Sequence, residues 1–301
     1  MSQLSSLLHF IYSSPNFVPG IVGVTASFAG AWGAQVSILR REQKREKLAS
    51  VRAFNEALAL SFAIGNNFMS LKSQHLMGML ERFRETEKNV QAHLQRILAS
   101  KPSDKFEPIA CAMELHTLPI SKVPIERLET VVFEKITVDT KTLNLVIEIH
   151  KAIDALNTSI RTRNELIQKW LGEGPTVNDS VRTIRYLGIH TDKGADETYK
   201  QTLFAIEKYC DDCIYFTTRL DVELNKRGNK MRRYRFPFFN PLPQIAEADF
   251  SSERAQRLMP DAKEYEDWES GFVKPPTFRD KLTKLVRRKN KKITPPKSPE
   301  A

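Results

Sequence analysis

"DTKTLNLVIEIHKAIDALNTSIRTRNELIQKWLGEGP", residues 139–175, carries the periodic pattern that decides the predicted fold. Its inward positions recur every three or four residues, the spacing of an α-helix that buries one face. They are Val146, Ile149, Ile153, Leu156, Ile160, Arg163, Ile167 and Trp170. Asp139 or Thr140 can cap the start of this helix. Gly172, as a left-handed cap, and Pro175 predict its end.

Two further segments show the same period. The first has Phe54, Leu58, Ser61, Gly65, Phe68, Leu76, Leu80, Phe83, Glu87, Val90, Leu94 and Ile97; the second has Tyr199, Leu203, Ile206, Cys210, Cys213, Thr217, Leu220 and Leu224. We expect the first helix to reach about Ala99, with a kink near Gly65, and the second to end near Gly228. A shorter helix is expected over 177–187. Because amphipathic helices must bury their apolar faces against one another, residues 40–228 are predicted to form a bundle of long antiparallel helices with coiled-coil-like seams. The fold class is mainly α, since 12 glycines in 301 residues give too few turns for a many-stranded sheet.

An uncharged stretch from Phe17 to Leu39 precedes this bundle. Its 23 residues would make a helix of about 35 Å, enough to cross a hydrocarbon core of about 30 Å. We expect a single transmembrane helix over 17–39, with residues 1–16 as a short extracytoplasmic N-terminus. A cleaved signal peptide and a buried core helix are the alternatives, although the positive charge follows the apolar run instead of preceding it. The basic residues Arg40–Lys47 predict a single-pass protein in the plasma or inner membrane, N-terminus outside and C-terminus cytoplasmic.

Small residues line one face of this stretch at spacings of three and four. They are Gly23, Ala26, Ser27, Gly30 and Gly33. Such a face lets a second helix approach closely in lipid, which predicts a homo-oligomer or a protein partner. The alternative is that glycine is simply common in membrane helices.

The C-terminal part, residues 229–301, is predicted to be a Pro-containing basic arm. Within it, 278–289 has the pattern of a short basic amphipathic helix. Its cations, expected to contact a membrane surface or another anion, are Lys281, Lys284, Arg287, Arg288 and Lys289. A solvated tail and a nucleic-acid contact are the alternatives, and the net charge of +10 suits either anionic partner. Lipid is the favoured partner, and nucleic acid is possible but not favoured.

The cysteines are the candidate metal ligands. Cys210 and Cys213, with Cys111 and His116, could complete a zinc site, but the first two occupy inward positions of a helix, which favours a role as small core residues. No metal and no cofactor are predicted. Three cysteines without repeated spacing also do not form a disulfide framework. The inward Arg163 needs a carboxylate partner, for which Glu87 is the hypothesis, and a solvated position near a helix end is the alternative.

No catalytic motif is present, so the chain is not expected to be an enzyme. The sequence predicts a membrane-anchored helical interaction or scaffold protein that holds a partner, or copies of itself, at the cytoplasmic membrane face. A membrane-tethered protein that uses its basic arm on nucleic acid is the first alternative. An enzyme with an unrecognised site in the bundle is the second.

Overall fold

The computed structural model describes residues 17–99, 111–173, 178–191, 194–233 and 242–272, and the side chains of 17–26 and 98 lie outside that description. The elements are α2 (Phe17–Leu71), η1 (Lys72–Leu76), α3 (Met77–Ala99), α4 (Ile125–Thr130), η2 (Val131–Lys135), α5 (Thr140–Gly172), α6 (Asp179–Leu187), α7 (Thr198–Arg233), α8 (Glu253–Leu258), η4 (Ala262–Tyr265) and α9 (Glu266–Ser270). Within these residues there is no strand, only an isolated bridge between Thr191 and Gly194. Two compact units divide at Met259, and α9 and η4 belong to the second. The mainly helical class is confirmed.

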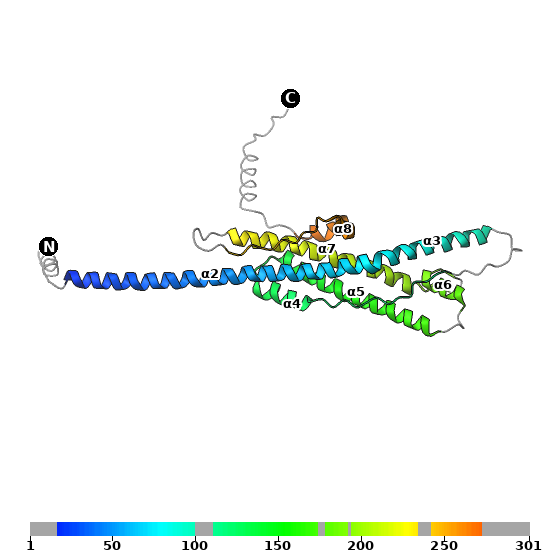
Figure 1. Cartoon of the computed structure of the whole chain (residues 1–301), viewed down its shortest axis with the longest axis horizontal. Coiled ribbons are helices and arrows are strands. Elements are labelled where there is room, and N and C mark those ends of the chain that lie inside the picture. Colours follow the sequence, from blue (N-terminus) through cyan, green and yellow to red (C-terminus); the bar gives the residue numbers. More distant parts are fainter. Residues whose placement is uncertain (1–16, 100–110, 174–177, 192–193, 234–241, 273–301) are drawn as a thin grey trace, which may run out of the picture. The chain divides into compact units, whose positions relative to one another are not determined.

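The core of the first unit is a bundle in which α7 packs against both α2 and α5 (Figure 1). The inward positions predicted on α5 and α7 are all buried, from Val146 to Trp170 and from Tyr199 to Leu224. The predicted bundle of long helices is therefore confirmed. Its predicted antiparallel order is only partly right: α7 runs against α2 and α5, but α2 and α5 run in the same direction (Figure 1).

The parallel order of α2 and α5 arises from the segment between them. In residues 111–124 the chain runs back along α5, because Leu118 bonds to Asn164 and the later Ser121 bonds to the earlier Asn157. A chain that returns in this extended form starts its next long helix at the end of the bundle where the previous long helix entered it. The predicted up-and-down pattern overlooked this return.

The first long helix continues to Ala99 as expected, but without the expected kink at Gly65. The irregularity is the π-helical turn η1, where one extra residue enters the turn. Gly65 has another role: a Cβ there would lie 2.9 Å from Thr217 Oγ1 of α7. The glycine therefore allows α2 and α7 to approach closely.

The ends of α5 and α7 correct two expectations. Asp139 caps α5, its side chain accepting from Thr142 N, but Gly172 is the last helical residue and is not among the glycines with positive φ. Helix α7 runs past Gly228 to Arg233. A Cβ at Gly228 would lie 3.0 Å from Ile245 Cδ1, so this glycine accommodates a neighbouring segment and does not end the helix. The expected short helix is α6, capped by Asn178.

The predicted transmembrane helix, residues 17–39, forms the start of α2, but it is not supported as a membrane span. In the part of the chain that the structure describes, no helix is long and apolar enough to cross a bilayer. The described side chains of this apolar run begin at Ser27. Gly30, Gly33 and Gln35 dilute this run, and Arg40 ends it. The helical backbone is confirmed; the single-pass assignment is not.

Candidate functional site

The part of α2 that precedes the bundle is the first candidate surface. We call residues 27–50 the α2 extension, because Val51 is the first buried residue in the described chain. Large apolar side chains on it face solvent: Phe28 is 75% exposed, Trp32 71%, Ile38 56% and Leu39 50%. Water-exposed aromatic groups of this size cost free energy that a binding partner would recover.

The α2 extension has two different faces. At about 100° per residue, Phe28, Trp32 and Leu39 fall within about 40° of one another around the helix axis. Gly30 lies on the opposite side and Gly33 about 100–140° from these three side chains, and a Cβ added at either glycine would meet no atom within 4 Å. Of the predicted small-residue face, Gly23 and Ala26 lie outside the described side chains, and Ser27 is exposed. The extension thus presents a bulky face and an open glycine face.

A basic cluster follows the apolar residues directly. We use this name for Arg40, Arg41, Lys44, Arg45 and Lys47. The first four are exposed, and the structure gives them no acidic partner among the residues it describes. Their charge is therefore available to an anionic surface.

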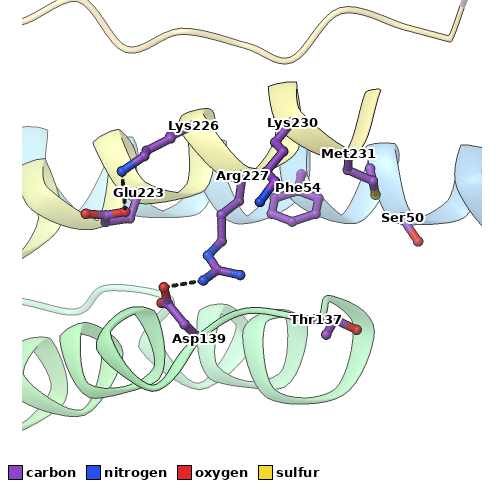
Figure 2. Close-up of a pocket in the computed structure, with 9 residues that line it drawn as sticks. All are labelled: Ser50, Phe54, Thr137, Asp139, Glu223, Lys226, Arg227, Lys230 and Met231. Atoms are coloured by element: carbon purple, nitrogen blue, oxygen red, sulfur yellow. Dashed lines mark ion pairs between the residues drawn. The ribbon is translucent and has the colours of Figure 1, made fainter. Parts of the chain in front are cut away.

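The second candidate is a pocket of about 530 Å³ enclosed by α2, the start of α5 and the end of α7 (Figure 2). We call it the α7 pocket. Its lining comprises Ser50, Phe54, Thr137, Asp139, Glu223, Lys226, Arg227, Lys230 and Met231. This volume falls in the range typical of small-molecule sites. Because α5 begins and α7 ends beside the root of the α2 extension, the pocket lies at the same end of the bundle as the extension (Figure 1).

Asp139 and Arg227 close one side of this pocket with an ion pair that joins α5 to α7 (Figure 2). The other carboxylate oxygen, Oδ1, accepts hydrogen bonds from the Thr142 amide at 3.0 Å and the Thr142 hydroxyl at 2.7 Å. Burial by itself would raise the pKa of Asp139, but Thr142 and Arg227 outweigh it and lower the pKa below its ordinary value. Asp139 is therefore a fixed anion whose charge Arg227 neutralises.

Glu223, the second acid of the pocket, is balanced in the same way. Its carboxylate lies 3.7 Å from Lys141 Nζ and 3.9 Å from Lys226 Nζ. Lys230 has no acidic partner among the described residues, and it is exposed at the mouth of the pocket. The pocket thus keeps an uncompensated positive charge. Its lining includes no histidine or cysteine, so the arrangement fits ion binding better than nucleophilic catalysis.

The proposed pair between Arg163 and Glu87 does not form. Arg163 is fully buried, but its guanidinium donates to backbone carbonyls, to His116 O at 2.7 Å and Glu114 O at 3.3 Å, and to the Tyr199 hydroxyl at 3.1 Å. Glu87 instead pairs with Lys200 of α7. Backbone carbonyls and a hydroxyl, which no sequence pattern reveals, take the place of the expected carboxylate.

The four candidate zinc ligands lie in different surroundings. Cys210 and Cys213 are fully buried, and Cys210 Sγ lies 3.5 Å from Phe68 O of α2. Burial raises the pKa of Cys210 to about 12, so this thiol stays protonated. Cys111 contacts Thr183 of α6 instead, and the His116 side chain is 90% exposed. In the described residues no cluster of three or more potential ligands could hold a metal ion.

A buried carboxyl on α7 is a feature that the sequence does not predict. Asp221 is 3% exposed, and neither of its oxygens has a hydrogen-bond partner among the described atoms. Burial raises its pKa to about 7, and the nearby Ser61 of α2, whose hydroxyl donates to Thr217 O at 3.2 Å, offsets only part of this rise. The sequence pattern identifies Ser61 and Thr217 only as parts of helical seams.

The sequence pointed to the pocket only partially. Asp139 was expected as a helix cap, but no local pattern joins it to Arg227, 88 residues further along the chain. The predicted basic helix 278–289 and its five cations lie outside the described residues. Comparisons with protein-family models, curated proteins and solved structures find no match to this chain. Its role must therefore be inferred from its own residues.

Proposed function

We propose that this chain is a helical interaction protein whose α2 extension binds lipid and a partner helix, so that the bundle is held at an anionic membrane surface. The observation that carries the proposal is the exposed apolar surface of the extension, immediately followed by the basic cluster. An enzymatic role has no comparable support in the described residues.

The bulky face supports the lipid contact. Transfer of Phe28, Trp32 and Leu39 from water into an apolar phase gains about 1.5–3 kcal/mol for each side chain fully buried. An amphipathic helix can lie along the membrane surface with its apolar face in the headgroup and acyl boundary, so insertion of the bulky face does not require this segment to cross the membrane. Each cation of the basic cluster near anionic headgroups adds about 1 kcal/mol.

The glycine face supports contact with a second helix. Gly30 and Gly33 leave the backbone uncovered on a side turned away from Phe28 and Trp32. A partner helix, for which we propose a second copy of this chain, can pack there while the bulky face stays in lipid. The orientation of the chain across a membrane, and any use of the C-terminal arm on nucleic acid, remain predictions of the sequence.

Vesicle binding by the full chain tests the lipid contact. We expect Phe28→Ser/Trp32→Ser/Leu39→Ser to lose at least tenfold in affinity for vesicles of phosphatidylglycerol and phosphatidylcholine. The folded bundle should be preserved, since none of these side chains is buried in it. The matched control is Phe133→Ser/Leu171→Ser/Val222→Ser, which removes three exposed apolar side chains from the bundle itself. Equal binding by the two triple variants would contradict the proposal.

The oligomeric state tests the helix contact separately. Gly30→Leu/Gly33→Leu should shift the full chain toward monomer in detergent or in vesicles, as measured by cross-linking, without lowering its affinity for lipid. Self-association that persists in this variant would remove the second copy from the proposal. Binding to anionic vesicles should also weaken when Arg40, Arg41, Lys44 and Arg45 are replaced by Gln, and when salt is raised.

A further inference from the structure

We propose that the α7 pocket binds the phosphate group of a small anionic ligand that also carries an apolar part. The inference does not depend on the proposed function, because it concerns a different surface and different residues. It rests on the charges, the lining and the position of the pocket.

One cation of the pocket has no acidic partner among the described residues. Two acids and three cations line the pocket, and each acid is engaged: Asp139 by Arg227, and Glu223 by Lys141 and Lys226. Lys230 remains unpaired among the described residues. It lies four residues after Lys226, so the two side chains start from the same face of α7, and the Lys226 ammonium points to Glu223, from which a bound anion would draw it (Figure 2). Like charges at this spacing repel each other, and an anion between them removes the repulsion.

Asp139 and Arg227 have a positioning role here. Because Thr142 and Arg227 hold the Asp139 carboxylate from both sides, that acid does not compete for Lys226 or Lys230. The pair also fixes α7 against the start of α5, which sets the width of the pocket (Figure 2). The Ser50 hydroxyl of α2 adds a neutral hydrogen-bonding group to the lining.

The lining also explains why the ligand should have an apolar part. Phe54 is 3% exposed and lines the pocket from α2, and Met231 lines it from α7. A volume of about 530 Å³ is far larger than a bare phosphate requires. A phosphate on Lys226 and Lys230 would leave room for hydrocarbon against Phe54 and Met231. Phosphate esters of lipids and free phosphate share the charged group, so both must be measured.

The test is calorimetric titration of the full chain with inorganic phosphate, dihexanoyl phosphatidate and dihexanoyl phosphatidylcholine, the lipids below their micelle concentrations. We expect phosphatidate to bind at least tenfold more tightly than inorganic phosphate, and phosphatidylcholine to bind more weakly than phosphatidate. Equal affinity for phosphate and phosphatidate would support a phosphate site but contradict the proposal that the ligand carries an apolar part. Absence of binding by both would overturn the proposal.

Variants locate the site. Lys226→Gln/Lys230→Gln should weaken phosphatidate and phosphate at least tenfold, while the exposed positions of both lysines leave folding intact. The control Lys151→Gln/Lys208→Gln removes the same charge from other surface ion pairs, with Lys208 lying about 27 Å before Lys226 along α7. An equal loss in both double variants would show a general charge effect and overturn the site. Met231→Ala should weaken phosphatidate alone; an unchanged phosphatidate affinity would overturn the apolar contact.

Discussion

Asn164 holds the backbone of Leu118 with both atoms of its side-chain amide: Oδ1 accepts from Leu118 N at 2.9 Å, and Nδ2 donates to Leu118 O at 2.7 Å. Asn157 does the same to Ser121, at 3.1 Å for each bond. The spacings match, since seven residues of helix and three residues of extended chain both rise about 10 Å. The two asparagines therefore fix the returning segment to α5 in one register.

Removal of these amides should loosen the segment. We expect Asn157→Ala and Asn164→Ala each to lower the free energy of unfolding by about 1–3 kcal/mol, because each leaves a partly buried backbone amide and carbonyl without partners. Chemical denaturation measures the loss. Asn67→Ala, at an exposed position of α2, should change stability by less than about 0.5 kcal/mol. Equal effects at all three positions would mean that the asparagines do not hold the segment.

Arg163 should contribute more to the stability of the fold than its lack of a carboxylate partner suggests. Arg163→Met is expected to cost about 2–4 kcal/mol in unfolding free energy, since two carbonyls and the Tyr199 hydroxyl each lose a charged donor. Arg161→Met, two residues earlier and exposed, is the matched control. Glu87→Gln should cost less than about 1 kcal/mol, because Glu87 pairs with Lys200 and not with Arg163. A larger effect at Glu87 than at Arg163 would reverse this assignment.

The helices could be predicted from sequence because burial of one face imposes a period. Every inward position predicted from Val146 to Trp170 is buried, including the charged Arg163. The end of α7 was missed for a physical reason: Gly228 usually signals a helix end, but here it admits the side chain of Ile245. Glycine serves both purposes, and the sequence alone does not distinguish them.

The candidate sites were less predictable. The α2 extension was visible in the sequence as an apolar run followed by positive charge. The same residues carry the proposed lipid contact. The α7 pocket was not visible, because Phe54, Asp139 and Lys230 meet only after three helices pack. The parallel order of α2 and α5 depends on amide contacts from Asn157 and Asn164, which follow no repeating pattern.

Asp139 predicts a stability change at acidic pH. Its pKa is lower in the folded chain than in the unfolded one, so the cap and the pair with Arg227 stabilise the fold fully above about pH 4, and this contribution is lost as the pH falls through the folded pKa. Asp139→Asn can still cap α5, so it should lose less stability than the native chain between about pH 5 and pH 2. Asp139→Ala should cost about 1–2 kcal/mol at pH 7. Denaturation at several pH values measures both, and identical acid profiles of the Asp139→Asn variant and the native chain would argue against the pair.

Asp221 predicts a change of opposite sign. Its pKa is raised to about 7 by burial, so the folded chain holds a proton that the unfolded chain releases near pH 4. Stability should therefore fall as the pH rises from about 4 to about 7 and then level off. Asp221→Asn removes the ionisation, and we expect it to raise the unfolding free energy by about 1–3 kcal/mol at pH 8 but to change it little at pH 4.5.

His150 is a second group whose pKa is raised in the folded chain, and its contribution must be separated from that of Asp221. The hydrogen bond with Glu129 raises the pKa of His150, so its contribution is present below about pH 6.5 and is lost as the pH rises through its folded pKa. Urea denaturation in steps from pH 4.5 to pH 8 gives the unfolding free energy of the native and Asp221→Asn chains. Because both chains contain His150, its contribution cancels in the difference between these two free energies. His150→Gln should leave that difference unchanged. A difference that is constant across the whole range would show that Asp221 is ionised throughout, and that water or a cation reaches the interface between α2 and α7.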